Sequence, residues 1–586
     1  MNLLFVDPNP LFVDSPSCIL DGLLTFALEK IYTSSFMKKQ TLLLVFGLIL
    51  SIANAQRTID EKLIQHFDKL LSEQFKPDEP GATVLVSHKG QVIYSKAFGM
   101  ANMELNVPME IGNVFWIASI GKQFTAVAIL QLMEQGKLSL QDEITKFIPD
   151  YPTQGNKITI EHLLTHTSGI HNYSGMDDPE KTFAFDCTPT EVIDFFKNLP
   201  MRFTPGTKWE YSNSGYFLLG YIIEIITGKT YEEYLEENFF KPLGMTNSLF
   251  ASTKKIIKNR VGAYSLGETG FENSRSLNMT HIYSAGAIQS TVEDLFKWHK
   301  AVHAYTVLKK ETLDKAFTRY TLTDGKKTDY GYGWRLGYVF ENASIWHGGN
   351  IEGFGTTEIY LPNEDVFVAV FSNCDCNYPK EIASRLAALA AGTPYEYQEI
   401  PVVPTLLQEY TGVYENQKDQ QRIITMSDNM LFSQLGRGQK FKLNAYQNDM
   451  FFFEHNAMQT IEFLRNKKGE IITLITKKLD GNDFWTKTNK PVPDSNGIKV
   501  DGMILQTYVG EYEITSEMRF VVTREVDSIF VQAPGQDKLE MFGETETKFF
   551  LKVNDAQFEF LKDDTGQVIK VIVNQGGRTI EAIKVK

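Results

Sequence analysis

The chain has 586 residues, and its formal net charge at pH 7 is −14. This length exceeds the usual size of a single domain. Because the balance is acidic and no run of lysine and arginine interrupts it, the chain lacks the electrostatic footprint of a protein that binds nucleic acid or an anionic membrane.

The first apolar segment has the pattern of a secretory signal peptide. Residues 37–39 are Met-Lys-Lys, an apolar run covers 42–52, and residues 53–55 are Ala-Asn-Ala. A basic start, a short apolar core and Ala-x-Ala predict cleavage before Gln56, and the run is too short to span a membrane. We expect an exported protein, periplasmic or secreted, with residues 1–36 a leader or a mis-assigned start. The alternative is an apolar N-terminal helix that packs on the body of the protein.

Three cysteines follow the predicted cleavage site: Cys187, Cys374 and Cys376. An odd number argues against a disulfide framework. Cys374 and Cys376 are also too close in the sequence for an ordinary bridge to be expected. We interpret these cysteines as structural.

The segments that follow predict a mixed α and β domain. A helix is expected over 57–73, and a hairpin over 82–87 and 92–98. Apolar helical patterns fill the middle of the region, and strands return at 356–360 and 366–371. Early strands, a helical insertion and late strands predict an α+β fold. In that fold the two ends of the region share one antiparallel sheet, and the active site lies between sheet and helices.

Ser119 and Lys122 open an apolar helix. Residues three apart lie on one helical face. An ammonium group in apolar surroundings loses part of its pKa and can then deprotonate a neighbouring hydroxyl. The alternative is that Ser119 is only the N-cap of the helix, since Ser-x-x-Lys also occurs at Ser35 and Ser252.

Tyr211 and Asn213 lie in a turn before a second apolar helix, expected over 216–226. A phenol beside a lysine ammonium would have a lowered pKa and could pass a proton to a leaving group. Asn213 would bond Lys122 or a substrate amide. The alternative is a tyrosine that only caps the turn.

His347, Gly348 and Gly349 precede the late strands. Two glycines let another backbone approach closely, which suits an edge strand that binds an extended substrate. The main-chain N–H groups of Ser119 and Asn350 would then form an oxyanion hole. The alternative is a histidine beside a glycine turn.

His162, His166 and His171 are close enough in the sequence to suggest a metal site. However, no glutamate follows His162 as a zinc-peptidase motif requires. We predict no metal and no cofactor, and we expect these histidines to bond backbone groups at the rim of the active site.

In this order the three motifs resemble the serine β-lactamase and penicillin-binding protein superfamily. The class C β-lactamase branch, with its esterases, DD-carboxypeptidases and D-aminopeptidases, is the most similar in style. Further stretches agree over about residues 57–393: 163–169, 205–206, 242–245, 284–286, 290–295 and 330–334. The resemblance implies these roles: Ser119 nucleophile, Lys122 base or proton relay, Tyr211 general base, Asn213 contact to substrate or lysine, and His347 the residue of the third motif.

The third motif departs from the family pattern, because many members carry lysine where this chain has His347. Lysine offers a fixed positive charge to a substrate carboxylate, whereas histidine is only partly charged at neutral pH. The change is more typical of the esterase and aminopeptidase members than of true β-lactamases.

Beyond residue 391 the sequence becomes β-patterned and repeats itself. Residues 407–414 return as 505–512, an offset of 505 − 407 = 98. Each copy has about 80 residues, enough for a small antiparallel barrel that closes its own edges. The copies resemble lipocalin-like modules appended to some hydrolases of this superfamily. Scaffolding, oligomer contact, a lid over the substrate and a separate ligand site are the roles open to them.

The predicted domains are a serine hydrolase over 56–393 and two β domains over 394–490 and 491–586, preceded by a signal peptide over 37–55. We predict that the hydrolase forms an acyl-enzyme with a peptide, amide or ester, D-amino-acid peptides first. The alternatives are a β-lactamase or DD-carboxypeptidase, and a non-catalytic protein that binds or senses cell-wall peptides. The expected partner is a small molecule or short peptide, with no nucleic acid and no stable membrane span.

Overall fold

The computed structural model describes residues 61–175, 186–252, 254–377, 379–393, 397–416, 420–454, 456–478, 481–493, 497–515, 518–534, 536–554, 556–575 and 578–585. The chain divides into one unit that ends at Leu70 and a second unit, Leu71–Lys586. Residues 61–70 of the first unit are helical, and the helix continues to residue 74. The predicted leader and signal peptide lie outside the described residues.

A six-stranded antiparallel sheet joins the two ends of the hydrolase region, as the sequence predicts. Its order is β10-β11-β12-β13-β1-β2. The strands are β1 (Ala82–His88), β2 (Gln91–Phe98), β10 (Arg335–Val339), β11 (Asn342–Ile351), β12 (Phe354–Leu361) and β13 (Val366–Ser372). Every residue of β12 and β13 is buried, so both faces of the sheet are covered at its centre.

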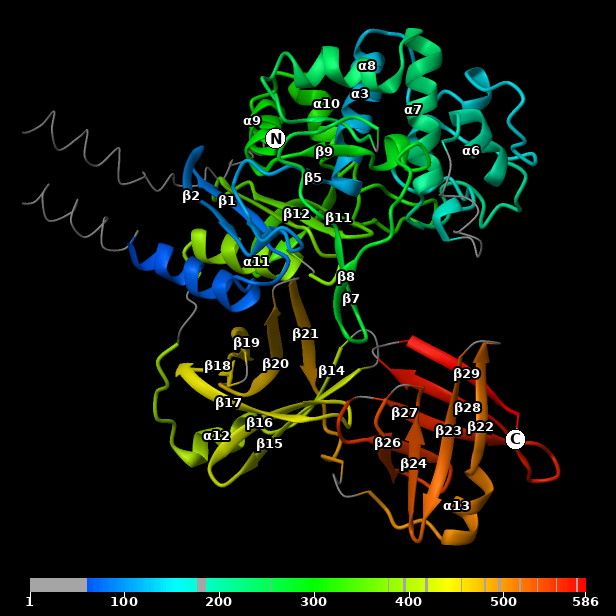
Figure 1. Cartoon of the computed structure of the whole chain (residues 1–586). Coiled ribbons are helices and arrows are strands. Elements are labelled where there is room, and N and C mark those ends of the chain that lie inside the picture. Colours follow the sequence, from blue (N-terminus) through cyan, green and yellow to red (C-terminus); the bar gives the residue numbers. More distant parts are fainter. Residues whose placement is uncertain are drawn as a thin grey trace, which may run out of the picture. The chain divides into compact units, whose positions relative to one another are not determined.

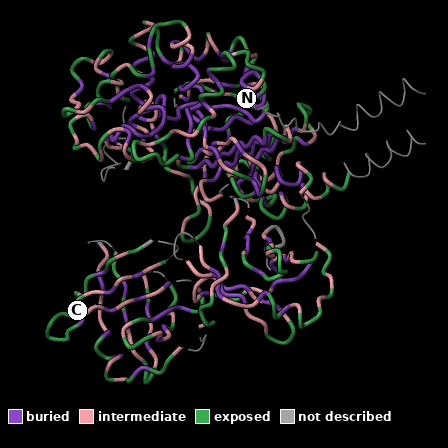
Figure 2. The backbone as a smooth tube through the Cα atoms, turned by 180° about the vertical axis from the view of Figure 1, so that it is seen from behind, coloured by how far each residue is buried: buried purple, intermediate pink, exposed green. Residues whose placement is uncertain are grey.

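Helices form the middle of the region and cover the sheet. They are α3 (Lys122–Glu134), α4 (Ile160–Leu164), α6 (Pro189–Phe196), α7 (Asn213–Thr227), α8 (Tyr231–Leu235), α9 (Val292–His303), α10 (Lys310–Ala316) and α11 (Pro379–Ala390). Figure 1 shows α3, α7 and α9 on one side of the sheet and α11 on the other. Buried residues run through the sheet and the inner helices (Figure 2). The α+β fold predicted from the sequence is confirmed.

Two helices carry the predicted motifs. The first nine residues of α3 are all buried, including the polar Lys122, Gln123 and Thr125. A 3₁₀ turn, Ala118–Gly121, precedes α3, and the Ser119 side chain makes no capping bond there. Helix α7 begins three residues before the predicted start. Ser212 caps it by accepting the N–H of Gly215, and Gly228 ends it in the left-handed region at φ 69°.

Short strands connect these elements. They are β3 (Met100–Asn102), β4 (Val107–Pro108), β5 (Phe115–Trp116), β6 (Leu249–Phe250), β7 (Tyr264–Gly267), β8 (Gly270–Asn273) and β9 (Ile288–Ser290).

The repeated C-terminal sequence forms two closed eight-stranded antiparallel barrels. The first contains β14 (Gly412–Glu415), β15 (Gln421–Ser427), β16 (Met430–Leu435), β17 (Lys440–Gln447), β18 (Met450–Phe453), β19 (Asn456–Arg465), β20 (Ile471–Lys478) and β21 (Gly481–Lys487). The second contains β22 (Gly510–Thr515), β23 (Met518–Glu525), β24 (Ser528–Gln532), β25 (Leu539–Gly543), β26 (Lys548–Leu551), β27 (Gln557–Lys562), β28 (Val568–Gln575) and β29 (Arg578–Lys584).

The barrels repeat each other in detail. A short helix precedes each one, α12 (Pro404–Tyr410) and α13 (Gly502–Tyr508). In each copy a buried tyrosine on the first strand donates its hydroxyl to the last carbonyl of that helix, Tyr414 to Tyr410 and Tyr512 to Tyr508, both at 2.7 Å. The predicted repeat and the predicted barrels are confirmed, whereas their likeness to lipocalin modules stays a prediction.

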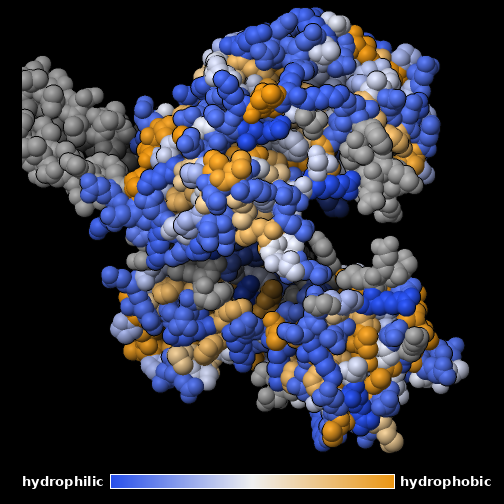
Figure 3. All heavy atoms as spheres, in the orientation of Figure 1, coloured by the Kyte–Doolittle hydropathy of each residue, from blue (hydrophilic) through white to orange (hydrophobic). Residues whose placement is uncertain are grey.

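Hydrophilic residues cover most of the face seen in Figure 3, with hydrophobic residues scattered among them. Within the described ranges, no helix combines the length and apolar character needed to cross a bilayer.

Candidate active site

Ser119 and Lys122 meet where the 3₁₀ turn runs into α3. Lys122 Nζ lies 3.1 Å from Ser119 Oγ, and the lysine side chain is fully buried. Nζ also donates to Asn213 Oδ1 at 2.8 Å and to the carbonyl of Ala285 at 2.6 Å. The structure therefore brings together three of the residues that the sequence singled out, from the 3₁₀ turn, α3 and α7.

Burial holds the pKa of Lys122 well below its ordinary value, and the nearby charge of Arg335 lowers it further. A neutral amine has two N–H bonds and one lone pair. In the neutral form of Lys122, Asn213 and Ala285 can accept both N–H bonds, which leaves the lone pair for the hydroxyl of Ser119. This arrangement can remove the serine proton.

Asn213 is held in one orientation by residues that the sequence analysis missed. Its backbone N–H donates to Asn172 Oδ1 at 3.0 Å, and its Nδ2 donates to Ser174 Oγ at 2.9 Å. Because Nδ2 is engaged there, Oδ1 is the atom that faces Lys122. No residue-type signal marks Asn172 or Ser174 beyond their position just after the 163–169 stretch.

Tyr211 lies over the lysine, with its ring centroid 4.9 Å from Lys122 Nζ. Its buried hydroxyl makes no hydrogen bond of normal geometry to any described residue. The predicted lowering of its pKa is wrong. Burial raises the pKa of Tyr211 to about 12, and this outweighs the opposing effects of Ser119 and Arg335. Tyr211 is a neutral phenol that can donate a proton.

The imidazole ring of His166 packs against the ring of Tyr211. Its ring centroid lies 4.3 Å from that of Tyr211, and its Nδ1 accepts the N–H of Ser212 at 3.1 Å. The His166 carbonyl accepts the N–H of Glu210 at 3.0 Å. His162 likewise accepts a backbone N–H, from Thr159 at 3.2 Å. These two histidines bond the backbone, as the sequence analysis expects.

His347 is buried, and both of its ring nitrogens bond within the protein. Nδ1 lies 2.7 Å from the carbonyl of Gly348, which only accepts, so Nδ1 carries the proton. Nε2 then accepts the hydroxyl of Tyr330 at 3.0 Å. Burial lowers the pKa of His347 well below its usual value, and Arg335 and Lys122 lower it further. His347 is neutral and brings no positive charge to the site.

The edge of β11 is open beside Ser119. Strand β10 covers β11 only as far as Trp346, which lies opposite Arg335, so residues 347–351 pair with no other described strand on that side. A Cβ added to Gly349 would lie 2.2 Å from the carbonyl oxygen of Ile117, whereas one added to Gly348 would find its first neighbours at 3.6 Å. Gly349 thus lets β11 lie directly against the turn that carries Ser119. The oxyanion hole of Ser119 and Asn350 stays a prediction.

Arg335 is the main residue that the sequence analysis missed. Its guanidinium lies 5.4–5.8 Å from four ring centroids, those of Trp209, Tyr211, Tyr330 and Trp346. It forms no ion pair with a carboxylate in the described part of the chain. The one available signal is its place directly after the 330–334 stretch. Arg335 supplies the fixed positive charge that His347 lacks.

A pocket of about 230 Å³ lies beside the open strand. Its lining includes Arg335, Trp346, Gly348, Asn350, Asn377 and Lys380.

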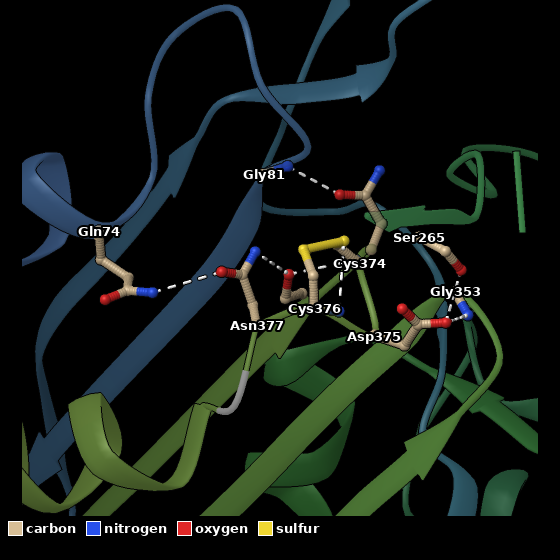
Figure 4. Close-up of a disulfide and its surroundings, with 10 residues drawn as sticks. Gln74, Gly81, Ser265, Gly353, Cys374, Asp375, Cys376 and Asn377 are labelled. Atoms are coloured by element: carbon tan, nitrogen blue, oxygen red, sulfur yellow. Dashed lines mark hydrogen bonds between the residues drawn. A yellow bond between two sulfur atoms is a disulfide. The ribbon is translucent and has the colours of Figure 1, made fainter. Parts of the chain in front are cut away.

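A disulfide between Cys374 and Cys376 fixes the loop that forms one wall of this pocket. The expectation that these cysteines are too close to bridge is wrong, since their Cα atoms are 5.1 Å apart, within the range of a disulfide. Figure 4 shows Asp375 directed toward Gly353 and Ser265, which donate to it at 2.9 and 2.7 Å. The loop is thereby tied to the turn between β11 and β12.

A family model described as beta-lactamase matches residues 61–392. The chain belongs to the β-lactamase family. Membership makes this chain a serine hydrolase. A domain of unknown function, DUF3471, matches twice, over 398–488 and 496–582.

Penicillin-binding proteins are among the relatives of this β-lactamase family member. Penicillin-binding protein 4* of Bacillus subtilis is 27% identical over 432 residues, which cover 68% of this chain and 93% of that protein. The octameric penicillin-binding protein homologue from Pyrococcus abyssi has a similar structure, with a TM-score of 0.50 and 26% identity over 73% of this chain and 99% of that one. The D-amino acid amidase from Ochrobactrum anthropi shares the fold, with a TM-score of 0.50 and 22% identity over 56% of this chain and 98% of that one.

Proposed function

We propose that this hydrolase of the β-lactamase family cleaves short peptides, amides or esters through an acyl-enzyme on Ser119. The observation that carries the proposal is the hydrogen bonding of Lys122. Its Nζ lies near two acceptors, Asn213 Oδ1 and the carbonyl of Ala285, and near Ser119 Oγ, so that a neutral amine at this position would direct its lone pair at Ser119 Oγ.

In the first half of the reaction, Ser119 Oγ attacks the carbonyl carbon while its proton moves to Lys122 Nζ. The N–H groups of Ser119 and Asn350 stabilise the oxyanion. The bond to the leaving group then breaks. Tyr211 gives its phenolic proton to that group and takes a proton from the Lys122 ammonium. Water adds to the serine ester in the second half, releases the carboxylic acid and restores Ser119.

The open edge of β11 supports a substrate with a free C-terminal carboxylate. An extended substrate that pairs antiparallel with residues 347–351 of β11 runs in the same direction as β10. It occupies the position that β10 would take if that strand extended further toward its N-terminal side. Because β10 begins at Arg335, the C-terminal end of such a substrate reaches Arg335. A guanidinium with no carboxylate partner in the described chain is suited to that terminal group.

The relatives named as penicillin-binding proteins support the same substrate class. We therefore place peptides that end in a D-amino acid first, ahead of β-lactams and simple esters.

A substrate panel measured with wild type and Arg335→Met tests this proposal. The panel pairs an N-acylated D-Ala-D-Ala dipeptide with its C-terminal amide and its L-L isomer, and adds a p-nitrophenyl ester and a chromogenic β-lactam. We expect the free D-D acid to have the highest kcat/KM. Arg335→Met should lower kcat/KM for that acid about 10- to 100-fold, through KM, because a charge-assisted contact is lost.

Two comparisons make the result specific to Arg335. The amide and the neutral ester should change much less than the acid in Arg335→Met. Lys380→Met removes the other cation that lines the pocket and should leave the ranking unchanged. Faster turnover of the β-lactam than of every peptide would favour a β-lactamase instead, and equal losses for acid and amide would contradict the role given to Arg335.

We also infer that the protein is exported, because residues 37–55 have the pattern of a signal peptide. Mass spectrometry of the protein recovered outside the cytoplasm should show an N-terminus at Gln56. A retained segment 37–55 would contradict export by cleavage.

A further inference from the structure

The two barrels have the same order of strands but differ in the residues of their interiors. The register places Arg422 opposite Tyr414 in the first barrel and Phe520 opposite Tyr512 in the second. By the same criterion Ser433 matches Val531, since they face Ile424 and Val522 respectively. Two more inward positions follow this rule: Thr476 matches Val573 and Trp485 matches Ala582. At these four positions an arginine, a serine, a threonine and a tryptophan of the first barrel thus correspond to purely apolar residues in the second.

Arg422 is buried in the first barrel without a carboxylate partner. The residue is 9% exposed, and among the described residues it forms no ion pair. Nη1 donates to Ser433 Oγ at 2.9 Å, and the guanidinium lies 4.8 Å from the ring centroid of Trp485. Burial lowers the pKa of Arg422 to about 10, with Asp483 opposing the change, so the group is charged at neutral pH.

Three buried polar atoms of these residues have no hydrogen-bond partner in the described part of the chain: Arg422 Nε, Trp485 Nε1 and Thr476 Oγ1. Buried polar groups in folded proteins are almost always paired, and a buried charge without a partner strongly destabilises the fold. The fold does not require this set, because the second barrel closes with Phe520, Val531, Val573 and Ala582 in its place.

We propose that the first barrel is a binding module for a small organic carboxylate, which pairs with Arg422. The groups present are a guanidinium, an indole N–H and two hydroxyls, all able to donate. A ligand that only accepts hydrogen bonds satisfies all of them, and the planar guanidinium matches a carboxylate in two-point geometry. Arg422 also lines a pocket with Leu435, Phe441 and Phe453, whose apolar side chains suit the organic part of the ligand; Val553 and Asn554 of the second barrel complete its wall.

Fluorine NMR of the full chain, labelled with 5-fluorotryptophan, tests this site separately from the active site. The chain has six tryptophans, and Trp485 is the one that belongs to a barrel. Its resonance is assigned by Trp485→Phe, and all measurements use a Ser119→Ala background so that no ligand is turned over. We expect acetate and N-acetylalanine to shift the Trp485 resonance saturably, and acetamide and N-acetylalaninamide to leave it unchanged.

Arg422→Phe is the matched variant, because phenylalanine is the residue of the second barrel at that position. It should abolish the carboxylate-dependent shift. Without ligand it should unfold at the same or a higher temperature than the parent, since it removes an unpaired buried charge. Carboxylate should raise the unfolding temperature of the parent and leave that of the variant unchanged. Arg422→Gln, which keeps a polar group of similar length, should also lose the shift.

Three results would overturn the proposal. The first is a Trp485 resonance that no carboxylate shifts. The second is a carboxylate-dependent shift in both Arg422 variants that equals the shift in the parent protein. The third is a shift with chloride or phosphate as large as the shift with the carboxylates, which would show that the site binds anions without preference for an organic carboxylate. If Arg422→Phe lowered the unfolding temperature strongly without ligand, the arginine would be structural.

Discussion

Replacing Lys122 with methionine is expected to lower kcat/KM by about 10,000-fold or more, because the base that takes the Ser119 proton is lost. Methionine keeps the length and burial of the side chain but has no lone pair basic enough for this step. Hydrolysis of the preferred peptide, followed at several enzyme concentrations, measures the loss. Serine and lysine act as one unit, so Lys122→Met, Ser119→Ala and the double variant should all fall to about the same level.

The shape of the wild-type pH profile gives a second check on Lys122. In the proposed mechanism the neutral amine is the base, so kcat/KM should rise as the pH increases through the lysine pKa and be lost below it. Because burial holds that pKa well below its ordinary value, activity should persist in solutions where an exposed lysine would be protonated.

A fluorophosphonate or penicillin probe should label the wild type and not Ser119→Ala.

The fold itself should tolerate Lys122→Met. The change removes a desolvated amine but leaves the acceptors of Asn213 and Ala285 unpaired, and these effects offset each other. The midpoint of thermal unfolding should therefore change little. Retention of more than about 1% of the wild-type kcat/KM would show that Lys122 is not the base.

Gly349→Ala is expected to lower kcat about 100-fold, because the added methyl group forces β11 away from Ser119. Its Cβ would lie 2.2 Å from the Ile117 carbonyl oxygen and 2.4 Å from Thr356 Oγ1, and neither backbone nor buried threonine can yield without moving the strand. A displacement of about 1 Å at a catalytic group costs about this much. Steady-state kinetics with the preferred peptide measure the change.

Gly348→Ala is the matched control. Its Cβ would meet neighbours at 3.6 Å or more, an ordinary van der Waals distance, so kcat should stay within about threefold of wild type. Equal effects of the two substitutions would contradict the close contact assigned to Gly349.

The residues that carry local sequence signals were predicted well. Ser119 and Lys122 have the spacing of one helical face, and Tyr211 and Asn213 precede an apolar helix, so each pair could be placed from its spacing together with the order of the motifs along the chain. The structure brings Ser119, Lys122 and Asn213 within hydrogen-bond distance and sets the Tyr211 ring over the lysine. The repeat likewise indicated two similar barrels.

The residues that sequence reasoning missed act through contacts that residue type does not encode. Ala285 contributes a backbone carbonyl, which any residue could supply. Arg335 lies beside the open edge of β11 because it is the first residue of β10, and where β10 begins along β11 is known only from the register of the sheet. The pKa of Tyr211 depends on how completely its hydroxyl is buried, so a neighbouring charge suggested the wrong direction. The close Cα atoms of Cys374 and Cys376 depend on the local backbone path.

The pairing of β1 with β13 has a consequence for how the hydrolase region is made. Ala82 pairs with Ser372. The centre of the sheet therefore forms between a segment that is synthesised early in the hydrolase region and one that is synthesised late. Such high contact order slows folding and leaves the apolar β1 uncovered while the helical insertion is synthesised. The nascent chain must therefore stay protected from aggregation until its last central strand is available.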